Sequence, residues 1–525
     1  MKKYIKNFLL LIFILITLTS CTQSQSTNEN SIILYVGTEI FDNTLDPVKG
    51  GMSYGYPFIN SALLKVSPSS EYVGDIATNW TVSDDALVYT FNLREDIKFG
   101  DGSIMTADDV VFTYITVQEN QAQNENIDLT LLKSVESVGD NQVVFTLSKP
   151  YSPFLDITSM LGIVPKDYYD SDSFNQNPIG SGPWKVLQYD SNQQIILAPN
   201  EYYYDGVPSI DRVTLVALDG QTSLSAAHSG DLDVVMVGSD YATQSVEGMT
   251  MIPLETIDIR MISLPMISRQ TVDGKVIGNN VTSDINVRCA LSVGIDRDKI
   301  IENSLNGIGK PAFGFTDNLV WANSENYTDG QIDKAIDILE KSGWIDIDGD
   351  GIREKDGIKC EFDLFAAEDR YPLIAALAEN AFDLGIKINA HSSNWNEISD
   401  KMQSESVLWG WGQFSPTVLP SLFDSKKIDT GGYDNVVSYS NIQIDELIDK
   451  ALDSSDFNDA MDYWKEVQVE SQKDLPYIYL VNIEHSYFIN DNLDISFSTQ
   501  IPHPHGHGSP ILCNLKDWTI KGVQH

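Results

Sequence analysis

The chain has 525 residues, several times the usual size of one domain, so we expect two or three packed units rather than a small disulfide-stapled scaffold. Hydrophobic residues make up 42% of the sequence, which is enough to build cores and argues against a disordered chain. The 75 acidic and 34 basic residues give a formal net charge of −41, which repels phosphate backbones and argues against nucleic-acid binding. Cations would be attracted, although an acidic surface also serves solubility alone.

The first twenty residues have the pattern of a signal peptide. Lysines precede an apolar run from Phe8 to Leu18, which is shorter than the roughly 20 residues of a membrane span. The following Leu18-Thr19-Ser20-Cys21 resembles a bacterial lipobox, in which the cysteine is lipidated and becomes the new N-terminus. We therefore expect residues 1–20 to be cleaved, residues 21–30 to form a flexible polar tether, and Cys21 to anchor the protein to the cell membrane on its extracytoplasmic face. The alternative is an ordinary secretory signal with a chance cysteine.

Strands and helices alternate irregularly in the rest of the chain. Residues 32–36 are typical of a buried strand, and three segments alternate apolar and polar residues as half-buried strands do: 87–93, 142–147 and 194–197. Thr106 is a predicted N-cap of a helix. Further helices are expected over 284–293, 329–341, 371–384, 443–452 and 457–473. The mixture predicts a mixed α/β (α+β) fold.

Several phrases occur together and in one order along the chain. They include Asp75-Ile76-Ala77-Thr78-Asn79-Trp80, Leu93-Arg94-Glu95-Asp96-Ile97-Lys98-Phe99, Pro178-Ile179-Gly180-Ser181-Gly182-Pro183-Trp184 and Asn200-Glu201-Tyr202-Tyr203. In this combination the chain resembles the peptide- and nickel-binding class of solute-binding proteins that serve ABC importers. The resemblance runs from about residue 31 to the C-terminus.

The resemblance implies a two-lobed periplasmic-binding-protein clamp that closes over its ligand, with an extra subdomain inserted in lobe I. Lobe I is expected over residues 31–255, with the inserted subdomain at about 51–165. Lobe II is expected over 256–485, and residues 486–525 form a tail that returns to lobe I. A hinge between the lobes lets binding energy select the closed form, which an importer can recognise. The implied partners are ABC permease and ATPase subunits, and the protein itself is expected to be a monomer.

The strongest local signal for chemistry is a cluster of histidines near the C-terminus, Ile501-Pro502-His503-Pro504-His505-Gly506-His507-Gly508. Neutral imidazole is a preferred ligand for nickel, copper and zinc, and the flanking Pro and Gly residues prevent a helix. We expect one or two of His503, His505 and His507 to coordinate a metal or to complete the shell of a metal chelate. The alternative is that they hydrogen-bond carbonyl groups in a structural loop. In the family that this chain resembles, such a tail implies nickel uptake.

The segment from Leu408 to Pro416 departs from the pattern of peptide-binding relatives. The resemblance implies an aspartate there that pairs with the α-amino group of a peptide, but this chain has Gly412 and Gln413. A buried ammonium group without a carboxylate costs several kcal/mol, which argues against the usual mode of peptide capture. Trp409 and Trp411 either wall a pocket and stack on a flat ligand or belong to the core.

Arginines are scarce, so those near the predicted cleft are further candidates for ligand binding. Arg260 and Arg370 could each pair with a carboxylate on a peptide or a chelator, or could form ordinary surface salt bridges. Tyr54 and Tyr56 lie in a Gly/aromatic segment that matches the family, and both are candidate cleft residues. The same segment matches the Gly-Xaa-Ser-Xaa-Gly pattern of hydrolases, but residues 46–50 before it do not form the hydrophobic strand that this motif requires.

An aspartate-rich loop resembles the start of a calcium-binding loop. Asp346, Asp348, Asp350 and Gly351 match the opening positions, but Gly357 stands where a bidentate glutamate is required. Structural calcium at the three aspartates is therefore one explanation, and an aspartate-rich turn into a hairpin is the other.

These observations favour a substrate-binding lipoprotein of an ABC importer that performs no covalent chemistry and requires no cofactor. The expected ligand is Ni(II), alone or as a nickel chelate. An oligopeptide is the second candidate, and a secreted hydrolase is the distant one.

Overall fold

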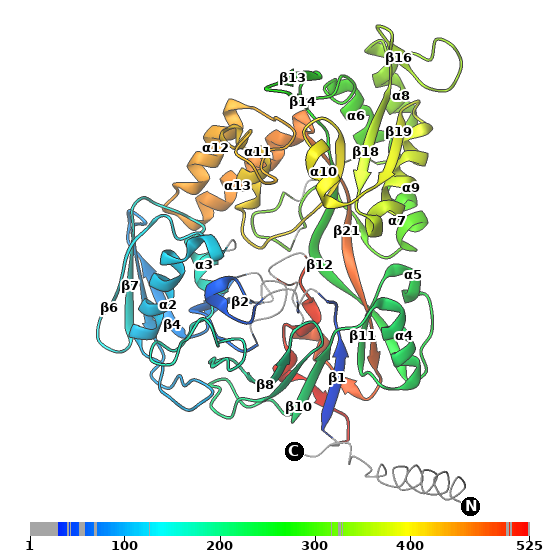
Figure 1. Cartoon of the computed structure of the whole chain (residues 1–525). Helices are drawn as coiled ribbons and strands as arrows, with labels where there is room; N and C mark the ends of the chain where they lie inside the picture. The colour runs from blue at the N-terminus through cyan, green and yellow to red at the C-terminus, as the bar shows by residue number, and fades with distance from the viewer. Residues whose placement is uncertain are drawn as a thin grey trace, which may run out of the picture.

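A computed structural model of the chain describes residues 30–522, with the exception of positions 39–40, 42–43, 52–57, 68–70, 125–126, 317, 324–326, 328, 500–502 and 504–506. Within these residues no helix combines the length and the apolar character needed to cross a membrane. Mixed sheets and helices form two lobes, which confirms the predicted fold class (Figure 1).

An 11-stranded sheet extends through both lobes. Its strands follow the order β19 (Lys387–Ser392), β18 (Glu361–Ala366), β20 (Ser406–Trp411), β12 (Met249–Ser263), β21 (Tyr477–Asn490), β11 (Val234–Val237), β1 (Ser31–Tyr35), β10 (Arg212–Val216), β9 (Gln194–Pro199) and β8 (Trp184–Asp190), and β15 (Lys310–Pro311) pairs with β21. We call the part with β1 and β8 to β11 lobe I and the part with β18 to β20 lobe II. Only the long strands β12 and β21 run through both (Figure 1).

The crossing between the lobes is marked by a break in strand pairing. β12 and β21 are antiparallel, and their register shifts between Glu255 and Ile259. The bulged residues are held by side chains: the Thr256 hydroxyl donates to the Ile483 carbonyl at 2.6 Å, and the Asn482 amide donates to the carbonyls of Thr256 and Asp258. A β-bulge bends its strand, and we call this crossing point the hinge.

Helices cover lobe II on both faces of its sheet strands. They are α6 (Ile285–Gly294), α7 (Arg297–Leu305), α8 (Ile332–Lys341), α9 (Tyr371–Phe382), α10 (Trp395–Lys401), α11 (Val418–Phe423), α12 (Ile442–Leu452) and α13 (Phe457–Asp474), with the 3-10 turns η4 (Glu368–Arg370) and η5 (Ser425–Lys427) and the hairpins β13 (Gln270–Val272)–β14 (Lys275–Ile277) and β16 (Glu354–Lys355)–β17 (Ile358–Lys359). Their starts follow from the sequence: Asp284, Asp296 and Asp456 each accept a hydrogen bond from a backbone N–H of the first turn.

A separate four-stranded sheet is inserted between β1 and β8, and we call the part from β2 to α3 the insert. It contains β2 (Leu64–Val66), β3 (Tyr72–Gly74), β4 (Ala77–Val82), β5 (Val88–Leu93), α2 (Ala107–Glu119), η3 (Gln121–Gln123), β6 (Leu132–Ser137), β7 (Gln142–Leu147) and α3 (Phe154–Met160). Alternate residues of β5 and β7 are buried, as their period-two pattern predicts. Phe91, Tyr114 and Phe145 form the centre of its own core.

The C-terminal tail packs against lobe I. It contains β22 (Leu493–Asp494), η6 (Phe497–Thr499), η7 (Pro510–Leu512), η8 (Leu515–Asp517) and β23 (Thr519–Ile520), and lobe I also carries η2 (Pro47–Lys49), α4 (Gly220–Ser229) and α5 (Ser239–Ala242). Trp518 is fully buried in the lobe I core, and the Ser509 hydroxyl donates to the Val36 carbonyl at 2.8 Å. The tail therefore brings His507 back beside the strands of the hinge.

A buried ion pair in lobe II provides a test of this architecture. Arg297 is 2% exposed, pairs with Asp329 at 2.5 Å, donates to the Tyr479 carbonyl on β21 and lies over the Phe313 ring. The substitution Arg297→Met leaves the Asp329 carboxylate without its partner, so we expect urea unfolding to show a loss of about 3–5 kcal/mol.

The control for this substitution is Lys341→Met. Lys341 pairs with Asp337 at 2.6 Å, and both side chains are more than half exposed. An exposed ion pair contributes at most about 1 kcal/mol to the free energy of unfolding. Equal losses of stability in the two variants would therefore contradict the interpretation that the Arg297 ion pair stabilises lobe II because it is buried.

Candidate functional site

A pocket of about 430 Å³ opens where lobe II meets the C-terminal tail. Its lining consists of Arg370, Trp395, Trp409, Gly410, Trp411, Gly412, Gln413, Tyr433 and His507. Four of the residues singled out from the sequence as site residues therefore lie together: Arg370, Trp409, Trp411 and His507. Trp395 and Tyr433 were not predicted, because they lie in segments without a motif.

Aromatic rings form one wall of the pocket. Trp409 contacts the rings of Tyr433 and Trp395, with centroid separations of 5.5 and 6.0 Å, and Trp411 lies 6.4 Å from Trp409. Trp409 is 4% exposed, packs in the lobe II core and also lines the pocket, and its contact with a ligand stays a prediction. The indole Nε1 atoms of Trp409 and Trp411 have no hydrogen-bond partner among the described residues. The wall can therefore stack on a flat ligand and donate two hydrogen bonds.

Arg370 supplies the pocket with a cation. Its guanidinium lies over the Trp395 ring, and its Nε has no hydrogen-bond partner among the described residues. Burial, together with the nearby positive charge of Arg260, lowers the pKa of Arg370 to about 10, while Asp258 opposes the shift. The side chain stays protonated at neutral pH, so it can form an ion pair with a carboxylate group of a ligand.

A salt bridge between Arg260 and Asp258 lies behind the pocket. Arg260 on β12 is directly opposite Gly410 on β20, and a Cβ added at Gly410 would lie 2.5 Å from the Arg260 Nη1 and 2.9 Å from the His507 Nε2. Glycine at position 410 thus leaves the space that these two side chains occupy. Arg260 is paired with the buried Asp258 and does not line the pocket, so its predicted role as a direct carboxylate ligand stays a prediction.

Asp258 is the charged centre of this region. It is 1% exposed, and its Oδ1 lies 3.6 Å from the His507 Nε2. Burial alone would raise the pKa of Asp258, but the positive charge of Arg260 outweighs burial and lowers this pKa below its usual value. The carboxylate is therefore ionised and pairs with Arg260.

The three candidate histidines have different positions. Burial lowers the pKa of His507, with Arg260 and Arg370 acting in the same direction against Asp258, so its imidazole is neutral at pH 7 and has a lone pair for a metal. His503 is 4% exposed and does not line the pocket, and it packs against the backbone of Gly508. His505, Tyr54, Tyr56 and Cys21 lie outside the described residues.

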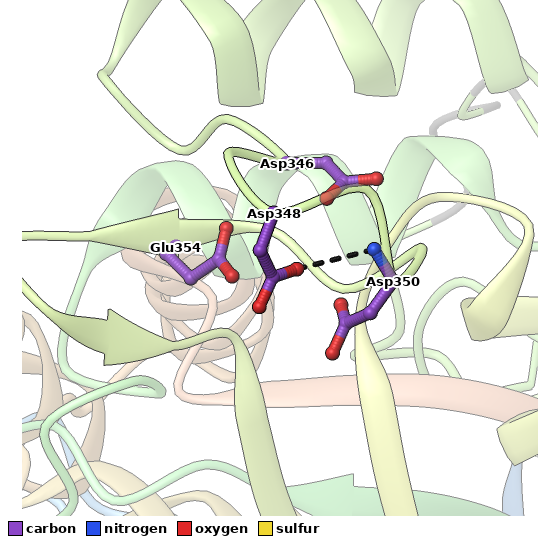
Figure 2. Close-up of side chains that lie close together, drawn as sticks. All are labelled: Asp346, Asp348, Asp350 and Glu354. Carbon is purple, nitrogen blue, oxygen red and sulfur yellow. Dashed lines mark hydrogen bonds between the residues drawn. The ribbon is translucent and has the colours of Figure 1, made fainter.

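The calcium hypothesis for the aspartate-rich loop is not supported. Asp346, Asp348, Asp350 and Glu354 do bring their carboxylates within 4.8 Å of one another (Figure 2). However, the Lys359 ammonium pairs with Asp350 and, at 3.4 Å, with Asp348, which is the position that a cation would take. Other carboxylate oxygens are hydrogen-bonded to the backbone: the Asp346 carboxylate accepts hydrogen bonds from the N–H groups of Gly349 and Gly351. These contacts fit an aspartate-rich turn that leads into the β16–β17 hairpin.

Comparison with known proteins places these features in a family. A model of bacterial extracellular solute-binding proteins, family 5 Middle, matches residues 71–429, which is more than half of the chain. The oligopeptide-binding protein AppA from Bacillus subtilis (strain 168) is 26% identical over 526 residues, covering 92% of this chain and 94% of that protein.

Solved structures show the same fold. NikZ from Campylobacter jejuni, in complex with Ni(L-His), has a TM-score of 0.74 at 24% identity and covers 93% of this chain and 99% of its own. NikA from Brucella suis, in complex with Fe(III)-EDTA, has a TM-score of 0.79 at 20% identity over 93% of this chain and 100% of its own. The resemblance expected from the sequence is confirmed: this chain belongs to family 5 of the bacterial extracellular solute-binding proteins, the peptide and nickel class that binds substrates for ABC importers and performs no catalysis.

Proposed function

We propose that this protein captures Ni(II) as a complex with a small chelator that carries a carboxylate. The observation that carries the proposal is the presence of the neutral His507 imidazole and the Arg370 guanidinium in one pocket. Imidazole is a good nickel ligand, and guanidinium matches a carboxylate in shape and charge. The tryptophan wall would stack on the flat part of the chelator.

The size of the pocket supports a small ligand. A volume of 430 Å³ lies in the lower part of the range of about 300–1,000 Å³ of small-molecule sites, which suits a metal with one or two amino-acid-sized chelators. The AppA structure holds a nonapeptide, whose nine backbone units and nine side chains need far more space. The NikZ structure holds Ni(L-His), which is of the size that this pocket admits.

The charges near the pocket support an anionic group on the ligand. Asp258 is 1% exposed, is paired with Arg260 and does not line the pocket, so it is not placed to receive the ammonium group of a peptide. Within the described part of the chain, the carboxylate recorded within ion-pair distance of Arg370 is that of Asp369, at 3.9 Å and 77% exposed. Arg370 is therefore the group available for an incoming negative charge. An oligopeptide stays the second candidate because AppA matches nearly the whole chain.

The proposed cellular setting follows from the N-terminal pattern and the family. Lipidation of Cys21 would hold the protein on the extracytoplasmic face of the cell membrane, and residues 21–30 would tether it within reach of a permease. We propose that it works there as a monomer.

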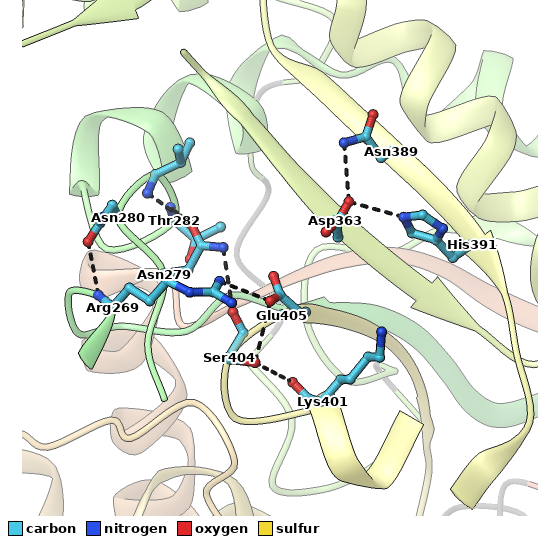
Figure 3. A network of polar contacts seen from close by, with 11 residues as sticks. Arg269, Asn279, Asn280, Thr282, Asp363, Asn389, His391, Lys401, Ser404 and Glu405 are labelled. Carbon is cyan, nitrogen blue, oxygen red and sulfur yellow. Dashed lines mark hydrogen bonds and ion pairs between the residues drawn. The ribbon is translucent and has the colours of Figure 1, made fainter. Parts of the chain in front are cut away.

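Titration calorimetry of the metal-stripped protein tests the ligand. We expect NiCl₂ with free histidine to bind, and His507→Ala and Arg370→Ala each to weaken binding by about 10- to 100-fold, because each variant loses a metal ligand or a charged hydrogen bond. His391→Ala is the matched control: this imidazole is in lobe II but pairs with Asp363 at 3.0 Å and does not line the pocket (Figure 3). If NiCl₂ gives no heat with or without histidine while a peptide mixture does, the nickel proposal is wrong.

A second prediction concerns the space at Gly410. Gly410→Ala would push against the Arg260 guanidinium and the His507 imidazole, so we expect a loss of stability of about 1–3 kcal/mol and about tenfold weaker binding of nickel–histidine by the folded protein. Gly220→Ala, where an added Cβ meets no atom within 4 Å, should bind as the unmodified protein does. Unchanged affinity in Gly410→Ala would show that Arg260 and His507 do not shape the ligand site.

A further inference from the structure

The insert touches lobe II along a seam that is separate from the hinge. The Ser152 N–H donates to the Leu452 carbonyl at 2.9 Å, and its hydroxyl donates to the Ala451 carbonyl at 2.8 Å. At the rim of the seam Lys149 lies 3.5 Å from Asp453, and both side chains are more than half exposed. Figure 1 shows α3 of the insert below α12 and α13 of lobe II. The two parts of the clamp are therefore in contact in this structure.

Aromatic rings fill the seam next to these hydrogen bonds. The Tyr72 ring of the insert makes edge contacts with Phe414 and Phe457 of lobe II, each with a centroid separation of 6.0 Å. Phe414 directly follows Gln413, which lines the pocket. One short segment of lobe II therefore connects the ligand pocket with the seam.

A buried carboxyl group lies next to Tyr72 at this seam. Asp156 on α3 is 3% exposed, its Oδ1 accepts a hydrogen bond from the Tyr72 hydroxyl, and its Oδ2 has no hydrogen-bond partner among the described residues. Burial raises the pKa of Asp156 to about 7, and the Ser415 hydroxyl of lobe II offsets part of this shift. A buried carboxylate with one unsatisfied oxygen is unfavourable, whereas the protonated acid is tolerated.

The groups that face Asp156 come from both sides of the seam. Tyr72 on β3 contributes a phenol hydroxyl, and the segment after β20 contributes the Ser415 hydroxyl. The Phe457 ring at the start of α13 packs on Tyr72 and so covers it from the lobe II side. The charged pair of Lys149 and Asp453 lies at the exposed rim. Part of the cover of Asp156 therefore belongs to lobe II and leaves when the lobes separate.

We propose that Asp156 takes up a proton when the clamp closes, so that closure is a pH-linked latch. In the open form the carboxyl loses the cover that lobe II provides, so its pKa falls from about 7 toward the ordinary value of 3.8. Between these two pKa values the open form is ionised and the closed form is protonated, so closing binds up to one proton. Closure weakens as the pH rises through this window, by up to about tenfold per pH unit, and becomes independent of pH above about 7. A mildly acidic exterior thus favours retention of the ligand.

Calorimetry with nickel–histidine as the probe tests proton uptake. At pH 5.5, titrations in two buffers of different ionisation enthalpy should show that the unmodified protein takes up about one proton more per binding event than Asp156→Asn does. Asparagine keeps the size of the protonated acid but cannot ionise, so this variant should also lose the fall in affinity between pH 5.5 and 7. Asp453→Asn, a carboxylate at the exposed rim of the same seam, is the matched control and should behave as the unmodified protein does. Equal proton uptake by all three proteins overturns the proposal.

Crosslinking of the ligand-free protein separates this proposal from the nickel assignment. Lys149→Cys and Asp453→Cys place two thiols across the seam, and a short bis-maleimide joins them only when the clamp closes. The rate is measured for this double-cysteine protein with Asp156→Asn and for the same protein with Asp156 present. The ratio of the first rate to the second no longer contains the pH dependence of thiol reactivity, because both proteins carry the same thiols. We expect this ratio to rise about tenfold per pH unit from pH 5.5 and to level off near pH 7. A ratio that does not change with pH overturns the latch, whatever ligand the pocket takes.

Discussion

The buried carboxylate of Asp258 at the hinge is the constraint on which the rest of the site depends. An ionised group that is 1% exposed is tolerated only where opposite charge and hydrogen-bond donors surround it. Arg260 provides that charge, and His507 comes within 3.6 Å from the tail. The need to pair one carboxylate thus fixes the position of a guanidinium, and the tail returns to the hinge with its imidazole beside this pair.

The local charge of the site differs from that of the whole molecule. The formal net charge of −41 repels anions at long range, but screening limits this field to about 8 Å at physiological ionic strength. Inside the pocket the effective dielectric constant is lower, so the nearby Arg370 outweighs distant surface carboxylates. For a chelate that combines a metal cation with a carboxylate, the acidic surface would attract the cation, and Arg370 in the pocket would bind the carboxylate.

The sequence predicted local structure better than the elements that join the lobes. α13 was expected at residues 457–473 and spans Phe457–Asp474, because Asp456 caps it and its apolar residues recur with helical spacing. The crossing points between the lobes were expected at residues 255/256 and 485/486, but the bounds of the hinge strands β12 and β21 were not predicted. β12 contains Pro253, and both strands are buried on two faces for much of their length, which removes the alternation that reveals a strand. In the site, the histidine-rich tail revealed His507, whereas Trp395 and Tyr433 reach the pocket only through tertiary packing. Asp258, a carboxylate within an apolar segment, was the available signal for the hinge.

The segment from Trp409 to Ser415 links the fixed hinge to the reversible seam. At one end Gly410 lies against the side chains of Arg260 and His507, and at the other Phe414 packs on Tyr72. The seam contributes two hydrogen bonds and two aromatic contacts, each worth about 0.5–1.5 kcal/mol, so closing gains only a few kcal/mol before the cost of ordering the side chains is subtracted. A gain of this size leaves open and closed forms close in free energy. A ligand that contacts both His507 of the tail and Arg370 of lobe II then needs only modest binding energy to select the closed form, which is the condition for a clamp that also has to release its cargo.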